Sequence, residues 1–136
     1  QESDFREEVM RITGGIGVDV TYDSVGRETV HRSIRSLRRR GLCVMFGASS
    51  GQVEGIAPLE LAEAGSVFFT RPHLADYMAS AEEIRARAGD LFDAFQAGKL
   101  HVPIDRVLPL SEASEAHRII ESRGTRGKLL LEVPQA

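Results

Sequence analysis

The sequence has little that would cross-link the chain or hold it in a membrane. It contains one cysteine, Cys43, so an intrachain disulfide framework is excluded, and so is a zinc site built on clustered cysteines. A lone thiol fits a reducing cytoplasm, the compartment we expect. No apolar run approaches the roughly 20 residues that span a bilayer. The first residues are polar and acidic and include no methionine, which predicts no signal peptide and indicates either processing or a piece of a longer protein.

Positive charge is not in excess either. The chain has 17 lysines and arginines against 20 aspartates and glutamates, a net charge of -3, so we expect neither nucleic acid nor an anionic membrane as a partner. The run Arg38-Arg39-Arg40 is expected in the last turn of a helix, where cations offset the dipole. The 4 histidines stand singly, without the spacing of metal ligands, and predict no metal site.

The sequence does have alternating helix and strand signals, over a length typical of one domain. It has 136 residues, 42% of them hydrophobic. Helical periodicity with caps and glycine stops predicts five helices, and short apolar or alternating runs predict five strands. Ser80 with Glu83 three residues later predicts a capping box at the start of the fourth helix. The helices are expected near 5–13, 30–40, 58–64, 81–97 and 111–121, and the strands near 18–22, 42–46, 67–70, 102–110 and 128–133.

This alternation predicts an α/β fold with a parallel sheet covered by helices. The continuous apolar run 42–46 suits a strand that is buried on both faces. In such sheets ligands bind beyond the carboxyl ends of the strands. Three loops therefore become candidates for a site: 23–27, 47–51 and 71–74.

The glycines of Gly15-Ile16-Gly17 are not interpreted as a dinucleotide fingerprint. They follow a helix and precede a strand, whereas the fingerprint needs the reverse order so that phosphate meets the amino terminus of a helix. We interpret them as an ordinary helix-to-strand turn.

The local sequence leaves the candidate loops open to two interpretations each. The segment 46–51 is either a ligand site, with Gly47 allowing close approach and successive amides forming a nest, or a flexible connection. Arg71 is either a clamp for phosphate or carboxylate or a solvated charge. The run 123–128 either holds a phosphate or forms a polar turn. Of the histidines, only His73 lies on a loop that would face a ligand.

Four segments together resemble one family, the quinone oxidoreductases, which form the zeta-crystallin-like branch of the medium-chain dehydrogenase/reductase superfamily. The resemblance covers essentially the whole chain, in order. The segments that carry it are Val20-Thr21-Tyr22-Asp23-Ser24-Val25-Gly26, Arg40-Gly41-Leu42-Cys43-Val44-Met45-Phe46-Gly47-Ala48-Ser49-Ser50-Gly51, Phe69-Thr70-Arg71-Pro72, and Glu121-Ser122-Arg123 with Gly127.

The resemblance implies a partial Rossmann fold. Residues 1–101 correspond to the carboxyl-terminal half of a nucleotide-binding domain, and residues 102–136 to a segment that returns to the substrate domain in the longer family members. The glycine-rich turn and most of the substrate domain have no counterpart in this chain. The resemblance further implies that members of this branch work without zinc.

The resemblance also implies an NADPH site, whose residues can be matched one by one to positions of this chain. Ser24, Val25 and Gly26 match the loop along the adenosine side of the cofactor. The segment Phe46, Gly47, Ala48 and Ser49 matches the one beside the nicotinamide ribose, although Ala48 stands where asparagine is common. Phe69, Thr70 and Arg71 match the strand end whose backbone pairs with the carboxamide, and Arg123 matches an arginine near the pyrophosphate. No residue is assigned as catalytic.

The implied reaction is hydride transfer from NADPH to a quinone or another small electrophile, with this chain alone incomplete and inactive. The alternatives are a fragment of an enoyl reductase of the same superfamily and a non-catalytic half-Rossmann interaction module. The strand 67–70 contains neither lysine nor proline and is expected to be an unprotected edge. We expect a homodimer through residues 66–70, as the resemblance also implies, or else a monomer whose edge is capped by residues 75–78.

Overall fold

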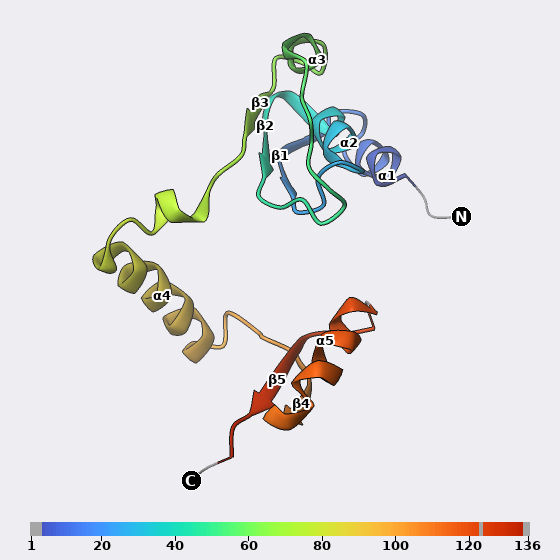
Figure 1. Ribbon diagram of the computed structural model, residues 1–136. Helices are drawn as coiled ribbons and strands as arrows, with labels where there is room; N and C mark the ends of the chain where they lie inside the picture. Colours follow the sequence, from blue (N-terminus) through green and yellow to red (C-terminus); the bar gives the residue numbers. More distant parts are fainter. Residues whose placement is uncertain (1–3, 123, 135–136) are drawn as a thin grey trace. The chain divides into compact units, whose positions relative to one another are not determined.

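Figure 1 shows the computed structural model, which describes residues 4–122 and 124–134. The chain divides into two compact units, Gln1–Met78 and Ala79–Ala136, and each is described by itself. Within the described ranges, no helix is long and apolar enough to cross a membrane.

The first unit is built on a parallel sheet of 3 strands in the order β1-β2-β3. A helix lies in each connection between consecutive strands, which confirms the predicted α/β alternation. The elements in chain order are α1 (Phe5–Ile12), β1 (Val18–Asp23), α2 (Val30–Arg35), β2 (Leu37–Met45), α3 (Pro58–Glu63), β3 (Phe68–Thr70) and the 3₁₀ helix η1 (Leu74–Tyr77).

The core of this unit lies on one face of the sheet, beneath α2 (Figure 1). Val30 and Ile34 of α2 are fully buried, as is Cys43 of β2. On the opposite face Tyr22 is 74% exposed and Phe68 63% exposed. The prediction that residues 42–46 are buried on both faces is therefore half right, because α2 and α3 pack on the Cys43 face.

The predicted helix over 30–40 is wrong in its second half. The helix α2 ends at Arg35, and β2 begins at Leu37, which pairs with Val18. The Val18 amide donates to the Ser36 carbonyl at 3.0 Å and fixes this change of direction. Leu37 is buried as its helical spacing predicts, but from a strand, because backbone pairing with β1 overrides the periodicity.

The three arginines that were expected at a helix end consequently lie in β2. The parallel pairing shifts its register between Val18 and Val20, and Arg40 takes a left-handed φ of 60° in this irregular stretch. Arg38 donates from Nε to the Asp19 carboxylate at 2.6 Å instead of facing helix carbonyls. The charges are solvated, as expected, but the helix-dipole argument does not apply to them.

The second unit contains a β-α-β arrangement preceded by a long helix. Its elements are α4 (Ala81–Gln96), β4 (Ile104–Pro109), the 3₁₀ helix η2 (Leu110–Glu112), α5 (Ala113–Glu121) and β5 (Lys128–Glu132), with β4 and β5 parallel. The predicted capping box of α4 is confirmed: Ser80 Oγ accepts from the Glu83 amide at 3.1 Å, and Glu83 Oε2 accepts from the Ala79 amide at 2.9 Å.

Candidate functional site

The predicted site residues of the first unit gather at one edge of its sheet. Residues 24–26 follow β1, residues 46–49 follow β2, and Phe69 and Thr70 end β3, with Arg71 directly after them. The three strands are parallel, so their carboxyl ends lie at the same edge. Arg123 lies outside the described residues.

The first two loops are joined along their backbones. The Phe46 amide donates to the Asp23 carbonyl at 2.8 Å, and the Ser50 amide donates to the Val25 carbonyl at 2.9 Å. The Ser50 hydroxyl adds a donor to the same Val25 carbonyl at 2.7 Å. These bonds favour a connected surface of two loops over the alternative of a flexible connection.

Gly47 is required by this joint. A Cβ built on Gly47 would lie 2.4 Å from the carbonyl oxygen of Ser24, closer than real side chains come. The sequence analysis expected a ligand to approach the backbone closely at Gly47. In the structure it is the Ser24 carbonyl of the neighbouring loop that does so. The interpretation of segment 46–51 as an amide nest is also wrong: five of its amides, those of Phe46, Gly47, Ser49, Ser50 and Gly51, donate to backbone carbonyls.

A buried carboxylate organises the first loop. Asp23 is 4% exposed and ends β1. Its Oδ1 accepts from the amides of Val25 and Gly26, each at 2.9 Å. The hydroxyl of Thr29 lies 2.8 Å from Oδ2, and the hydroxyl of Ser33 donates to the same oxygen at 2.7 Å. Asp23 therefore ties the loop 24–26 to the first turns of α2.

The ionised form of Asp23 is the one that this arrangement stabilises. Burial by itself raises the pKa of the carboxyl, but the hydrogen bonds that it accepts outweigh burial, and its pKa lies below the usual value. Sequence reasoning did not assign a role to Asp23, Thr29 or Ser33. The available signal was an aspartate at the end of a strand, followed by hydroxyl residues on the buried side of the next helix.

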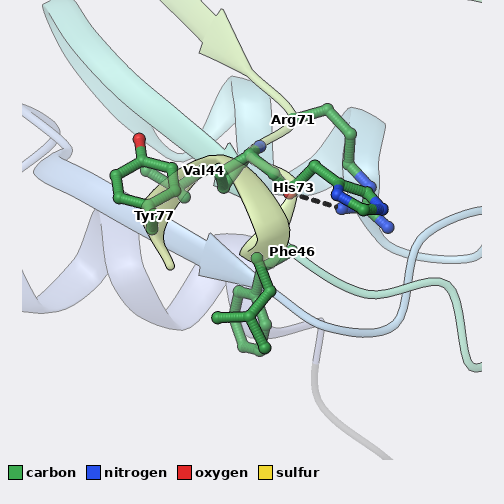
Figure 2. A pocket seen from close by; sticks show the side chains of 7 residues that line it. Val44, Phe46, Arg71, His73 and Tyr77 are labelled. Atoms are coloured by element: carbon green, nitrogen blue, oxygen red, sulfur yellow. Dashed lines mark hydrogen bonds between the residues drawn. The ribbon is translucent and has the colours of Figure 1, made fainter. Parts of the chain in front are cut away.

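A hollow of about 620 Å³ lies beside the third segment. Figure 2 shows it between β2 and η1, with Phe46 at one wall and the side chains of Arg71 and His73 on the opposite side from Tyr77. Val44, Pro72 and Leu74 complete the lining. His73, the histidine expected on a ligand-facing loop, does line this hollow.

The exposure of the site residues indicates which of them a ligand can reach. Ser24, Phe46, Ser49, Thr70 and Arg71 are exposed, and Phe46 presents 53% of its surface. Val25, Gly47, Ala48 and Phe69 are half-buried and Gly26 is buried, so these positions support the loops.

The remaining sequence motifs lie away from this edge. The predicted turn at Gly15-Ile16-Gly17 connects α1 to β1 at the opposite, amino-terminal end of the strand. Among residues 4–122 and 124–134, no three histidine, cysteine, aspartate or glutamate side chains are grouped as a metal site requires.

Comparison with known proteins identifies the family. The family model described as "Zinc-binding dehydrogenase" matches residues 1–131. The chain belongs to this family. The structural fit agrees: a crystal structure of the Escherichia coli quinone oxidoreductase complexed with NADPH superposes with a TM-score of 0.86, at 44% identity over 96% of this chain and 40% of that one.

Individual members of the zinc-binding dehydrogenase family confirm the resemblance to quinone oxidoreductases. The 2-haloacrylate reductase of a Burkholderia species is 46% identical over 98% of this chain and 40% of its own length. Quinone oxidoreductase 1 of Escherichia coli K12 is 44% identical over 96% of this chain and 41% of its own length. The chain thus spans about two fifths of the length of these relatives, in agreement with a partial Rossmann fold.

Proposed function

We propose that this chain supplies part of an NADPH-dependent oxidoreductase that transfers hydride to a quinone. The observation that carries the proposal is the meeting of three separate predicted cofactor segments at the carboxyl edge of β1, β2 and β3. The Escherichia coli relative, whose structure contains NADPH, supports the choice of cofactor.

The residues at this edge fit a nicotinamide dinucleotide in chemistry and placement. Ser24 and Ser49 are exposed hydroxyls on two joined loops, suited to ribose groups, and Phe46 offers an exposed ring beside the hollow. Thr70 is exposed at the end of β3, where the proposed contact with the carboxamide would fall. When bound, NADPH would supply the hydride, and these residues would orient it.

The chain alone is proposed to be inactive. The contacts that hold a pyrophosphate at a glycine-rich turn have no counterpart at Gly15-Ile16-Gly17, which precedes a strand. We also propose that residues 1–101 belong to the nucleotide-binding domain and residues 102–136 to the substrate domain, and that the enzyme works without zinc. The cytoplasm remains the expected compartment, since Cys43 is a free, buried thiol.

A chimaeric enzyme tests the proposed function. In it, this chain replaces the matching part of the Escherichia coli quinone oxidoreductase, so that the missing segments come from a relative 44% identical to it. We expect NADPH oxidation with 1,4-benzoquinone by the chimaera and none by the chain alone. A folded chimaera that binds no NADPH, or robust turnover by the chain alone, would refute the proposal.

We also propose a homodimer through residues 66–70. The supporting observation is that β3 is an outer strand of the described sheet and that Phe68 is 63% exposed. His73 and Leu74 would lie near the twofold axis. Light scattering at about 50 µM should give a dimer for wild type and a monomer for Phe68→Lys. The matched control is Phe92→Lys, at a residue 65% exposed in the second unit; a wild-type monomer, or a Phe68→Lys dimer, would contradict the proposal.

A further inference from the structure

The hollow beside β3 combines an apolar wall with uncompensated positive charge. Val44, Phe46, Pro72 and Leu74 form the apolar part of its lining. Arg71 is exposed, and the hydrogen bond that it makes runs from its guanidinium to the Pro72 carbonyl at 2.8 Å. None of the ion pairs formed within residues 4–122 and 124–134 includes Arg71.

This arrangement has the chemistry of a carboxylate receptor. A guanidinium presents five N–H donors in a planar fork, and the bond to Pro72 occupies only part of that set. The fork matches the two oxygens of a carboxylate, and such charge-assisted pairs are the stronger hydrogen bonds in proteins. His73 lies on the same side of the hollow as Arg71 in Figure 2 and adds a second polar group there.

The apolar wall favours a carboxylate that is attached to a short carbon chain. Phe46 and Leu74 face the same hollow as Arg71, so a short unsaturated chain attached to the carboxylate would contact carbon rather than water. Phe46 also belongs to the segment proposed to lie beside the nicotinamide ribose. A small acid held by Arg71 would therefore have its double bond near the cofactor.

We propose that this hollow binds the carboxylate of a small α,β-unsaturated acid, with Arg71 as the residue that determines specificity for the charge. The inference rests on the proposed function and names a substrate class for it. A relative 46% identical to the chain, the Burkholderia enzyme, is named 2-haloacrylate reductase, and 2-haloacrylate is an acid of this class.

The reaction balances with the cofactor already proposed. Hydride from NADPH forms a C–H bond at the β-carbon, the carbon–carbon π bond breaks, and its electron pair takes a proton from solvent at the α-carbon. NADPH is oxidised to NADP⁺ and the acid is reduced to its saturated form. Arg71 keeps its proton throughout and acts by holding the carboxylate.

The first test compares a charged with a neutral substrate in the chimaeric enzyme. The measured quantity is the ratio of kcat/KM for 2-chloroacrylate to kcat/KM for its methyl ester. Arg71→Met should lower this ratio about ten- to a hundredfold, because a charge-assisted pair is lost for the acid alone. Arg71→Lys should keep part of the ratio, and the control Arg39→Met, at an exposed arginine in β2, should leave it unchanged. An equal loss for acid and ester would overturn the inference.

The second test needs no turnover and separates this inference from the proposed function. In the 136-residue chain, 2-chloroacrylate at about ten millimolar should shift the Arg71 side-chain NMR signal, and Arg71→Met should abolish the nearby backbone shifts. The absence of any shift in wild type would refute carboxylate binding even if the chimaera reduces quinones. If the shift appears but the chimaera reduces neither substrate, the proposed function fails and the binding site stands.

Discussion

The two units differ in where their apolar side chains lie. In Gln1–Met78, α2 and β2 supply a fully buried cluster around Ile34 and Cys43. Among residues 79–122 and 124–134, Ala116 is the one buried apolar residue, whereas Phe92 is 65% and Leu91 60% exposed. The difference shows that the loops of the candidate site rest on a unit with its own core, while the second unit leaves many of its apolar side chains exposed.

The exposed apolar residues of the second unit are not scattered. Leu91, Phe92 and Phe95 of α4 line an apolar hollow of about 370 Å³, together with Leu100, Val102, Ile104, Lys128 and Leu130. An apolar surface of this kind contributes little to stability as long as it stays in water.

The largest expected effect is a cavity in the first unit. Ile34 is 0% exposed, and Ile34→Ala should lower the free energy of unfolding by about 2–5 kcal/mol, through lost burial and the cavity left behind. Phe92→Ala, although it removes a larger side chain, should cost less than about 1 kcal/mol. Urea denaturation followed by circular dichroism measures both. Equal costs would mean that Phe92 is covered in solution, and the contrast between the units would disappear.

Two glycine substitutions should have opposite signs. Gly47→Ala places a methyl group against the Ser24 carbonyl and should destabilise the first unit by roughly 1–3 kcal/mol. Gly89 lies within α4 with nothing near its Cβ position, so Gly89→Ala should stabilise that helix by about 0.5–1 kcal/mol. Thermal unfolding of the two variants checks both signs; a neutral Gly47→Ala would show that the two loops are not joined in solution.

The charge on Asp23 should appear in the pH dependence of stability. Its pKa is lowered in the folded chain, so its contribution is fully present above the unfolded-state pKa, about 3.9, and is lost as pH falls through the folded value. At pH 7, Asp23→Asn should cost about 1–3 kcal/mol by leaving buried donors poorly paired.

Asp19→Asn is the matched control, since the Asp19 side chain is 78% exposed and pairs with Arg38 at the surface. The difference in unfolding free energy between wild type and Asp23→Asn should shrink between pH 5 and pH 2, measured by urea titration at each pH. If the difference in unfolding free energy stayed constant across that range, the effect of Asp23→Asn would come from altered packing and not from the lost charge.

A small and local effect is expected at the helix caps. Ser80 caps α4 through the Glu83 amide, and Asp4 caps α1 through the Arg6 amide at 3.0 Å. Ser80→Ala should cost about 1 kcal/mol of local helix stability. Amide exchange should show faster opening of residues 81–84 with no change in β2; a loss of protection in β2 as well would mean that the two units unfold together.

The sequence predicted the types of the helices and strands better than it predicted the contacts between these elements. The strands around Cys43, Phe69 and Leu130 followed from apolar runs, and the capping box at Ser80 followed from side-chain chemistry alone. The helix predicted to extend through Arg40 was wrong, because pairing between Val18 and Leu37 is a tertiary fact that local periodicity does not contain.

At the candidate site, too, the sequence did not predict contacts between separate segments. The three loops could be placed at one edge from the rule for parallel strands. The role of Gly47 could not, since the atom that requires a glycine there, the Ser24 carbonyl oxygen, belongs to another loop. Asp23 was named as part of a family-like segment, but without a role of its own. Its partners Thr29 and Ser33 contact it only when α2 packs on the sheet.

The central claim is that this chain holds one part of an NADPH site and depends on further segments for the rest. Calorimetric titration with NADPH tests it most directly, with the 136-residue chain in one cell and the chimaeric enzyme in another. We predict a dissociation constant in the micromolar range for the chimaera, about -8 kcal/mol, and binding weaker by at least about 3 kcal/mol for the chain alone. Micromolar binding by the chain alone, or no binding by a folded chimaera, would contradict the account.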